Sequence, residues 1–101
     1  MTEVIHASAQ TIRNLKDVPA SFRLAAFALL NTQSGSISFV LPGDRVLEYR
    51  HDKTGPHATI IVHNYDFVKR AMAGGDVGFA EAYMDGDWST PDLTAVLRFF
   101  S

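Results

Sequence analysis

The stretch Ser36-Ile-Ser-Phe-Val-Leu-Pro-Gly-Asp-Arg-Val-Leu-Glu-Tyr-Arg50 decides the fold. From Ser36 to Leu41, large apolar side chains alternate with smaller ones, which predicts a strand with one apolar face. Pro42 fixes φ and Gly43 tolerates a positive φ, so residues 41–44 form a turn. The chain then returns as a second strand, and a β-hairpin is predicted over residues 36–50.

The sequence on either side of this hairpin predicts one further strand and four helices. The strand runs from His57 to His63, where most side chains are β-branched. The helices are predicted at residues 22–31, 64–73, 76–85 and 91–100. Polar loops are predicted at 32–36 and 51–56, and residues 1–18 carry only a weak helical stripe. The predicted class is α+β, with a small antiparallel or mixed sheet of about three strands packed against helices.

Capping residues set the predicted helix boundaries. The predicted N-caps are Ser21, Asn64, Asp76 and, within Thr90-Pro91-Asp92, Thr90. Gly74-Gly75 ends the second helix and Gly86 ends the third. The first helix is apolar at every position from Leu24 to Leu30, so we expect it to be buried on most sides or to face an apolar partner.

The composition limits what this chain of 101 residues can do. Hydrophobic residues at 47% and charged residues at 20% are ordinary for one globular domain. A net charge of −2 supplies no basic field for a nucleic-acid backbone. The chain has no cysteine, which excludes disulfides, thiol catalysis and cysteine-ligated zinc, and which suits a reducing cytoplasm.

The two ends of the chain carry different signals. The start has no basic segment followed by an apolar one, so a secretory signal is not expected. The apolar run from Leu24 to Leu30 is far shorter than the roughly twenty residues of a membrane span. Residues 93–101 stop in the middle of a helical pattern, so we expect one domain that belongs to a longer protein.

Residues 74–78, Gly-Gly-Asp-Val-Gly, form the most obvious candidate for a phosphate cradle. They follow a predicted helix instead of a strand and lack the spacing of known phosphate-binding loops. The favoured interpretation is the C-cap of one helix followed by the N-cap of the next. Lys69 and Arg70 are candidate phosphate contacts, although a solvated pair of basic residues is the commoner arrangement.

Histidines and carboxylates provide weaker candidates. His57 and His63 lie about 20 Å apart on a strand, too far to share a metal ion, and His51 lies in the loop before them. No metal site is predicted. Glu81 and Asp85 share a helix face, which permits an acid–base pair but is more typical of an exposed acidic surface.

Bulky side chains gather in the last quarter of the chain. Core packing is the default for them, and contact with lipid or with another domain is the alternative. The candidate contacts are Phe79, Tyr83, Met84, Trp88, Phe99 and Phe100.

Residues 74–88, Gly-Gly-Asp-Val-Gly-Phe-Ala-Glu-Ala-Tyr-Met-Asp-Gly-Asp-Trp, resemble the N-terminal domain of the cyclopropane-fatty-acyl-phospholipid synthase family. That family carries the run G-D-[LV]-G-[FL]-[GA]-E-[SA]-Y-[MV]-[DE]-G-x-W. The residues counted as the family motif, whether structural or at an interface, are Gly75, Asp76, Gly78, Glu81, Tyr83, Met84, Asp85, Gly86 and Trp88. Looser similarity extends the match over about residues 35–101.

The resemblance implies a lipid-modifying parent enzyme. Family members transfer a methyl or methylene carbon from S-adenosylmethionine to the double bond of an unsaturated phospholipid acyl chain. Their Rossmann-like catalytic domain follows this segment and binds the cofactor. The resemblance therefore implies no cofactor and no catalytic residue in this chain, and a fold similar to sterol-carrier domains. It also implies a bacterial cytoplasmic protein at the inner face of the membrane.

Two hypotheses follow. The leading one is a non-catalytic domain that engages a phospholipid or fatty acyl chain and contacts its own catalytic domain. The alternative is a docking or dimerisation module without a lipid site, in which the aromatic residues would cover a protein partner. A small independent enzyme that uses Glu81 and Asp85 ranks far behind both.

Overall fold

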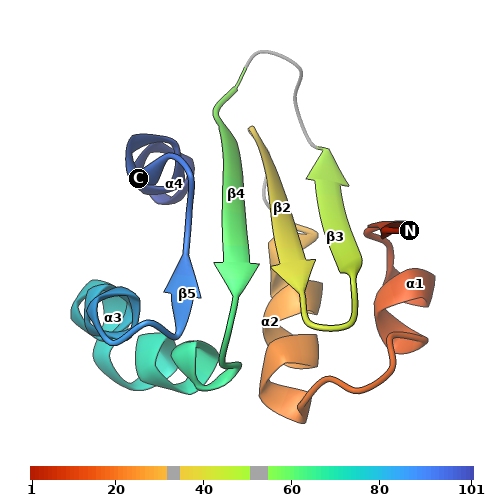
Figure 1. Cartoon of the computed structure of the whole chain (residues 1–101), viewed down its shortest axis with the longest axis horizontal. Helices are drawn as coiled ribbons and strands as arrows, with labels where there is room; N and C mark the ends of the chain where they lie inside the picture. Colours follow the sequence, from red (N-terminus) through yellow and green to blue (C-terminus); the bar gives the residue numbers. More distant parts are fainter. Residues whose placement is uncertain (32–34, 51–54) are drawn as a thin grey trace.

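The computed structural model describes residues 1–31, 35–50 and 55–101. At its centre is a mixed five-stranded sheet in the order β1-β3-β2-β4-β5 (Figure 1). The strands are β1 (Glu3–His6), β2 (Ser36–Leu41), β3 (Arg45–Arg50), β4 (His57–Val62) and β5 (Trp88–Ser89). The helices are α1 (Ala9–Arg13), α2 (Ala20–Leu29), α3 (Asp66–Met84) and α4 (Leu93–Phe100). The predicted α+β class is confirmed.

The predicted hairpin is present and forms the middle of the sheet. Strands β2 and β3 are antiparallel, with Phe39 opposite Leu47. Gly43 has a φ of 88° in the turn, as its position predicts. Strand β4 lies parallel to β2 and ends at Val62, one residue before the predicted end. The predicted loops fall partly on residues 32–34 and 51–54, including His51, which lie outside the described residues.

Two short edge strands extend the predicted three-stranded sheet. Within residues 1–18 only α1 is helical, and β1 pairs in parallel with β3. Strand β5 follows the 76–85 helix and pairs antiparallel with β4, and it was not among the predicted strands. The position of β5 beside β4 is fixed by the Asp87 carbonyl oxygen, which accepts hydrogen bonds from the backbone N–H groups of His63 and Asn64, each at 2.9 Å. Both strands depend on partners distant in sequence.

Three of the predicted N-caps are wrong, because the helices begin at other residues. Pro19 is the N-cap of α2, and Ser21 lies inside the first turn. Tyr65 is the N-cap of α3, although the Asn64 side chain does accept a hydrogen bond from the Asp66 N–H at 2.9 Å. In α4 the cap is Asp92, whose Oδ1 accepts from the Ala95 N–H at 3.1 Å. Sequence alone misplaces each cap by one or two residues. In α4, Thr90 and Asp92 compete for this role, whereas α2 and α3 begin at Pro19 and Tyr65, which make no side-chain capping bond.

Helix α3 contains both helices predicted at 64–73 and 76–85. Within Asp66–Met84 only Gly75 leaves the helical region, with φ 59° and ψ −138°. The predicted break at Gly74-Gly75 is therefore confirmed. Asp76, predicted as a cap, has helical dihedral angles and lies inside the following segment. We call residues 66–74 the first arm of α3 and residues 76–84 the second arm.

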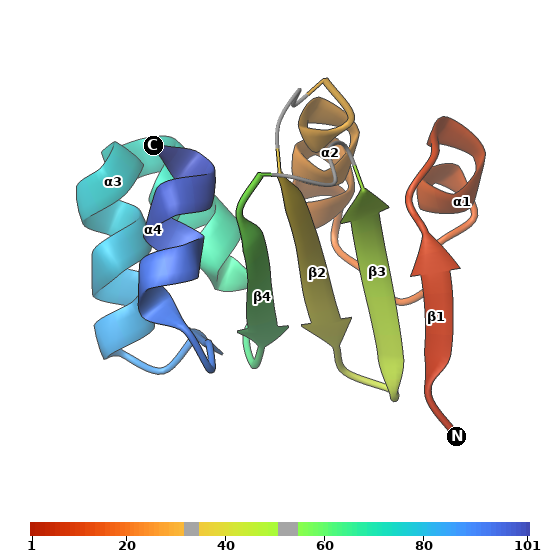
Figure 2. The ribbon, with the colours of Figure 1, turned by 90° about the horizontal axis from the view of Figure 1, so that it is seen from above.

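The helices bury the apolar face of the sheet. Phe22 of α2 meets Phe39 of β2 edge to face, with 5.8 Å between ring centroids. The Tyr49 hydroxyl donates to the Ala26 carbonyl oxygen at 2.7 Å. Helices α1 and α2 lie on the same face of the sheet, and α3 and α4 lie together at its β4 end (Figure 2). This arrangement places α2 beside α3 and leaves a groove between them.

Candidate lipid-binding groove

An apolar groove of about 500 Å³ lies between α2, the kinked α3 and the sheet. Its volume is in the range of small-molecule sites, roughly 300–1,000 Å³. Asp76 is the one ionisable residue among the described residues that line it. The lining residues are Phe22, Leu24, Ala25, Ala26, Ala28, Leu29, Phe39, Ile60, Phe67, Val68, Ala71, Met72, Gly75, Asp76, Phe79 and Phe100.

The sequence creates this space by placing small residues on the helices. Ala25 and Ala28 of α2 and Ala71 of α3 each contribute only a methyl group to the groove wall, and Gly75 contributes no side chain. Larger side chains stand at the rim, where Leu24 is 61% and Met72 65% exposed. Leu24 and Met72 therefore continue the apolar lining of the groove out to its edge.

The kink in α3 brings both of its arms to the groove. Val68 and Met72 come from the first arm, and Phe79 comes from the second. Gly78 allows this close folding, because a Cβ there would lie 1.9 Å from the Arg70 carbonyl oxygen. The glycines of residues 74–78 thus shape the helix and do not form a cradle in a strand-to-helix loop.

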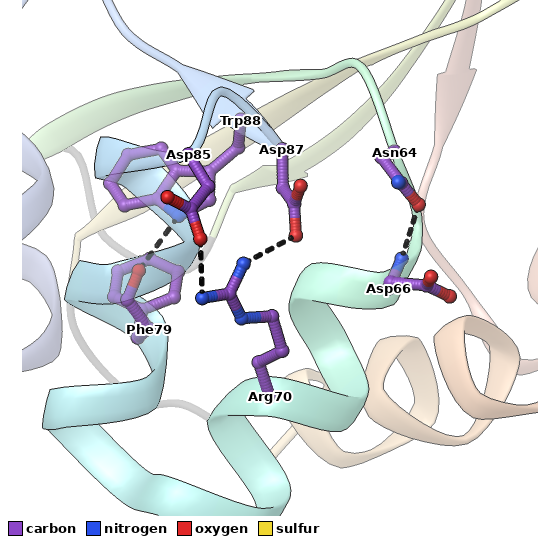
Figure 3. A network of polar contacts seen from close by, with 7 residues as sticks. All are labelled: Asn64, Asp66, Arg70, Phe79, Asp85, Asp87 and Trp88. Atoms are coloured by element: carbon purple, nitrogen blue, oxygen red, sulfur yellow. Dashed lines mark hydrogen bonds and ion pairs between the residues drawn. The ribbon is translucent and has the colours of Figure 1, made fainter.

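Arg70 ties the first arm of α3 to the turn that follows the second arm (Figure 3). Its guanidinium donates to Asp85 Oδ2 at 2.8 Å and to Asp87 Oδ2 at 3.4 Å. The hydrogen bond that Arg70 donates to Asp85 raises the pKa of Arg70, because it stabilises the charged form. We call this set of ion pairs the Arg70 clasp. It occupies Arg70 internally and argues against a role in holding a phosphate.

Trp88 is a core residue in this structure. It is 1% exposed, and its indole Nε1–H donates to the Phe79 carbonyl oxygen at 3.0 Å (Figure 3). Its ring stacks on Phe79 with 4.3 Å between centroids and packs against Tyr83 at 4.8 Å. A direct contact with lipid or another domain would require exposure that Trp88 lacks here, so its position in the motif is explained by packing.

The structure divides the other predicted contacts into two groups. Phe79 and Phe100 line the groove, as do the motif residues Gly75 and Asp76. The ring centroids of Phe79 and Phe100 are 5.5 Å apart. Phe99 is buried, Tyr83 is half-buried, and Met84 is 73% exposed away from the groove lining. Of the polar motif residues, Glu81 is exposed, and Asp85 and Gly86 form the turn beside the Arg70 clasp.

Lys69 lies in a second hollow of about 490 Å³ that shares Leu24 and Met72 with the groove. It is exposed, and no acidic partner is found for it among the residues that the structure describes. Of the two predicted phosphate contacts, Lys69 is therefore the one that remains available beside the groove.

The histidines and carboxylates do not assemble a reactive centre in the described part of the chain. His57 Nδ1 is hydrogen-bonded to Ser36 Oγ, and His63 Nε2 to Ser89 Oγ at 2.8 Å. Within residues 1–31, 35–50 and 55–101, no three histidine, aspartate or glutamate side chains come together in a metal-binding group. Asp85 is paired with Arg70, which removes it from the suggested acid–base pair with Glu81.

Sequence reasoning identified four groove residues and missed most of the others. Met72 has no local signal that separates it from the rest of its predicted helix, whereas the unbroken apolar run of residues 24–30, which contains Leu24, does indicate an apolar partner. None of the described helices is long and apolar enough to cross a membrane. Comparisons with protein-family models, curated proteins and solved structures give no match to this chain.

Proposed function

We propose that this chain is a non-catalytic domain that binds a lipid acyl chain in the groove between α2 and α3. The observation that carries the proposal is the groove itself, whose lining is apolar apart from Asp76. A hydrocarbon tail has no polar groups to satisfy, so its affinity for such a site grows with the apolar area that it buries.

The parent protein in this proposal is a cyclopropane-fatty-acyl-phospholipid synthase-like methyltransferase. The run of residues 75–88 supports the assignment, and so does the place of Gly75, Asp76 and Phe79 on the groove wall. S-adenosylmethionine would be bound by the parent's catalytic domain, and no residue of this chain is assigned to it. The domain would act at the inner face of the membrane, with a fold related to sterol-carrier domains.

A docking or dimerisation module is the second candidate. It is favoured by an exposed apolar stripe on α4, where Leu93 is 38%, Leu97 58% and Phe100 47% exposed. Residues three and four apart lie on the same side of a helix, so these three form one contiguous strip. A strip of this kind fits a protein partner, either a second copy or the catalytic domain.

A thermal melt separates the two candidates. The midpoint is measured with and without unsaturated phospholipid or fatty acid, at two protein concentrations. A ligand that binds only the folded state raises the midpoint, and the rise continues with the logarithm of the ligand concentration above its Kd, which is the result expected for the groove. A midpoint that rises with protein concentration and ignores lipid would overturn the acyl-chain proposal in favour of self-association.

A further inference from the structure

Strand β1 is an open edge of the sheet. It pairs in parallel with β3, and no described strand lies on its other side. Figure 2 shows β1 at one end of the sheet, with α3 and α4 at the opposite end. Edge strands carry backbone N–H and C=O groups that can pair with a strand of another chain. The four residues of β1 include neither a proline nor a lysine, which commonly prevent such pairing.

The hydrogen bonds to β3 determine which backbone groups of β1 remain free. The N–H groups of Glu3 and Ala7 donate to carbonyl oxygens in and just before β3, at 2.9 and 2.8 Å. Alternate residues of a strand bond to the same side, so Val4 and His6 direct their N–H and C=O groups away from β3. The His6 carbonyl oxygen accepts a hydrogen bond from the Thr11 hydroxyl at 2.7 Å. Val4 is thus the β1 residue whose donor and acceptor both lack a partner in the described part of the chain.

The Val4 side chain ends a row of β-branched residues that crosses the sheet. The pairing register places Val46, Val40 and Ile61 beside it in that order. Val46 precedes the buried Leu47, so the row lies on the face of the sheet away from α1 and α2. Val4 is 52% exposed at the open end of the row. An apolar side chain on an added strand would cover it and extend the row.

We infer that two copies of this chain associate by antiparallel pairing of their β1 strands, centred on Val4. A twofold axis at this residue lets the N–H group of each Val4 donate to the carbonyl oxygen of the other. In that register Glu3 lies opposite Ile5 of the partner subunit, and His6 lies opposite Thr2 of the partner subunit. No like charges meet directly, and the two valine side chains pack together. The strand is its own complement in this register, which favours a second copy over another extended chain.

A polar hollow of about 780 Å³ on the helix side of β1 leaves room for side chains of the second copy. Glu3 and Ile5 of β1 line it, so the incoming Glu3 of the partner subunit enters it opposite Ile5. The other described ionisable residues of the lining are Lys16, Asp17 and Arg45. Two cations therefore balance two anions in the hollow, and it does not repel the incoming carboxylate.

This association is separate from the proposed acyl-chain binding. The groove lies between α2 and α3, and its lining includes no residue of β1. A strand of four residues gives a small interface, so we expect a weak dimer that forms in concentrated solution.

Sedimentation velocity at protein concentrations from about 10 µM to 1 mM tests the association. The wild-type chain should shift from monomer to dimer over this range. Val4→Pro removes the outward N–H group and none that bonds to β3, so it should weaken dimerisation at least about tenfold. Val4→Thr is the matched control, because it keeps both the N–H group and the branched shape. Equal melting midpoints of the variants in dilute solution show that the monomer fold is intact.

A cysteine cross-link tests the register without depending on the proline variant. The chain has no cysteine, so Val4→Cys can form a disulfide only between two copies. At the twofold axis the two Cα atoms of residue 4 would be about 5.5 Å apart, within reach of a disulfide, whereas those of residue 6 would be about 14 Å apart. Under mild oxidation Val4→Cys should therefore cross-link at least about tenfold faster than His6→Cys. His6 is a stringent control because its side chain is 78% exposed on the same strand.

Leu97→Lys distinguishes this edge from the exposed strip on α4, and it should leave dimerisation unchanged. The inference is overturned if the wild-type chain stays monomeric at about 1 mM, or if Val4→Pro dimerises as well as the wild type. It is also overturned if Leu97→Lys abolishes the dimer, or if the two cysteine variants cross-link at the same rate. None of these results affects the acyl-chain proposal, which depends on the response to lipid.

Discussion

Gly78 lies where the two arms of α3 touch, and no larger residue fits there. A Cβ at this position would lie 1.9 Å from the Arg70 carbonyl oxygen and 2.7 Å from its carbon. Both are backbone atoms, so they cannot rotate aside as a side chain would. The tight contact explains why glycine occupies a helical position despite its poor helix propensity.

Gly78→Ala is expected to destabilise the domain by about 3 kcal/mol, the upper end of typical overpacking costs. Gly74→Ala is the matched control, because a Cβ there meets nothing within 4 Å. The control should gain about 0.5–1 kcal/mol from helix propensity. Urea denaturation measures both. An equal response of the two variants would contradict the close contact at Gly78.

Tyr49 links stability to alkaline pH. Burial raises the pKa of its phenol well above the usual value near 10. The unfolded chain therefore releases this proton at a lower pH than the folded chain does. Stability is unaffected below pH 10 and falls as the pH rises beyond it, because fewer protons are bound in the unfolded state.

Tyr49→Phe should cost about 1 kcal/mol at neutral pH through loss of the bond to the Ala26 carbonyl oxygen. It should also flatten the decline in stability between about pH 10 and pH 11.5. Tyr65→Phe is the comparison, since the buried Tyr65 hydroxyl has no hydrogen-bond partner among the described residues. The free energy of unfolding of Tyr65→Phe should therefore change little at neutral pH. A wild-type-like alkaline decline in Tyr49→Phe would argue against this assignment.

At the scale of elements, α4 depends on its cap. The Asp92 carboxylate accepts from the Ala95 N–H, and this helix has only two turns to stabilise itself. Asp92→Ala should cost about 1 kcal/mol, while Asp92→Asn should cost much less because Asn caps equally well. Chemical denaturation of the two variants provides the measurement. Equal losses in both would show that the charge, and not the cap, matters.

The elements that sequence could predict are those specified locally. The alternation in residues 36–41 and the turn at Gly43 are enough to predict the hairpin. Gly74-Gly75 is enough to predict the break in α3. Strands β1 and β5 are too short for a periodic signal. They form because distant carbonyl oxygens, such as Asp44 for the Glu3 N–H, happen to lie opposite them.

The candidate site was predictable only in part for the same reason. Phe79 and Phe100 stood out as bulky residues with a possible partner, and both line the groove. Trp88 stood out equally but is used in the core. The groove also needs Ala28 of α2 and Ile60 of β4, and no local pattern indicates that these would face the same space.

At the scale of the whole molecule, the groove can be filled without disturbing the core. Ala28 lines it and is exposed, so Ala28→Trp should occupy the tail's position while keeping the fold. We expect at least a tenfold loss of affinity for an oleoyl ligand, with little change in melting midpoint. Ala80→Trp is the control, an exposed alanine of α3 outside the groove lining. Equal binding by both variants would place the ligand elsewhere.

Because Gly75 is the one non-helical residue within α3, a rotation of its backbone would displace the second arm relative to the first. Phe79 is about 6 Å along this arm and Asp85 about 15 Å, so a 10° swing at Gly75 moves them by about 1 and 2.5 Å. The Arg70 clasp restrains the long end, where the displacement is greatest. A rotation at Gly75 would thus change the width of the groove at Phe79, and the ion pairs of Arg70 with Asp85 and Asp87 oppose such a rotation.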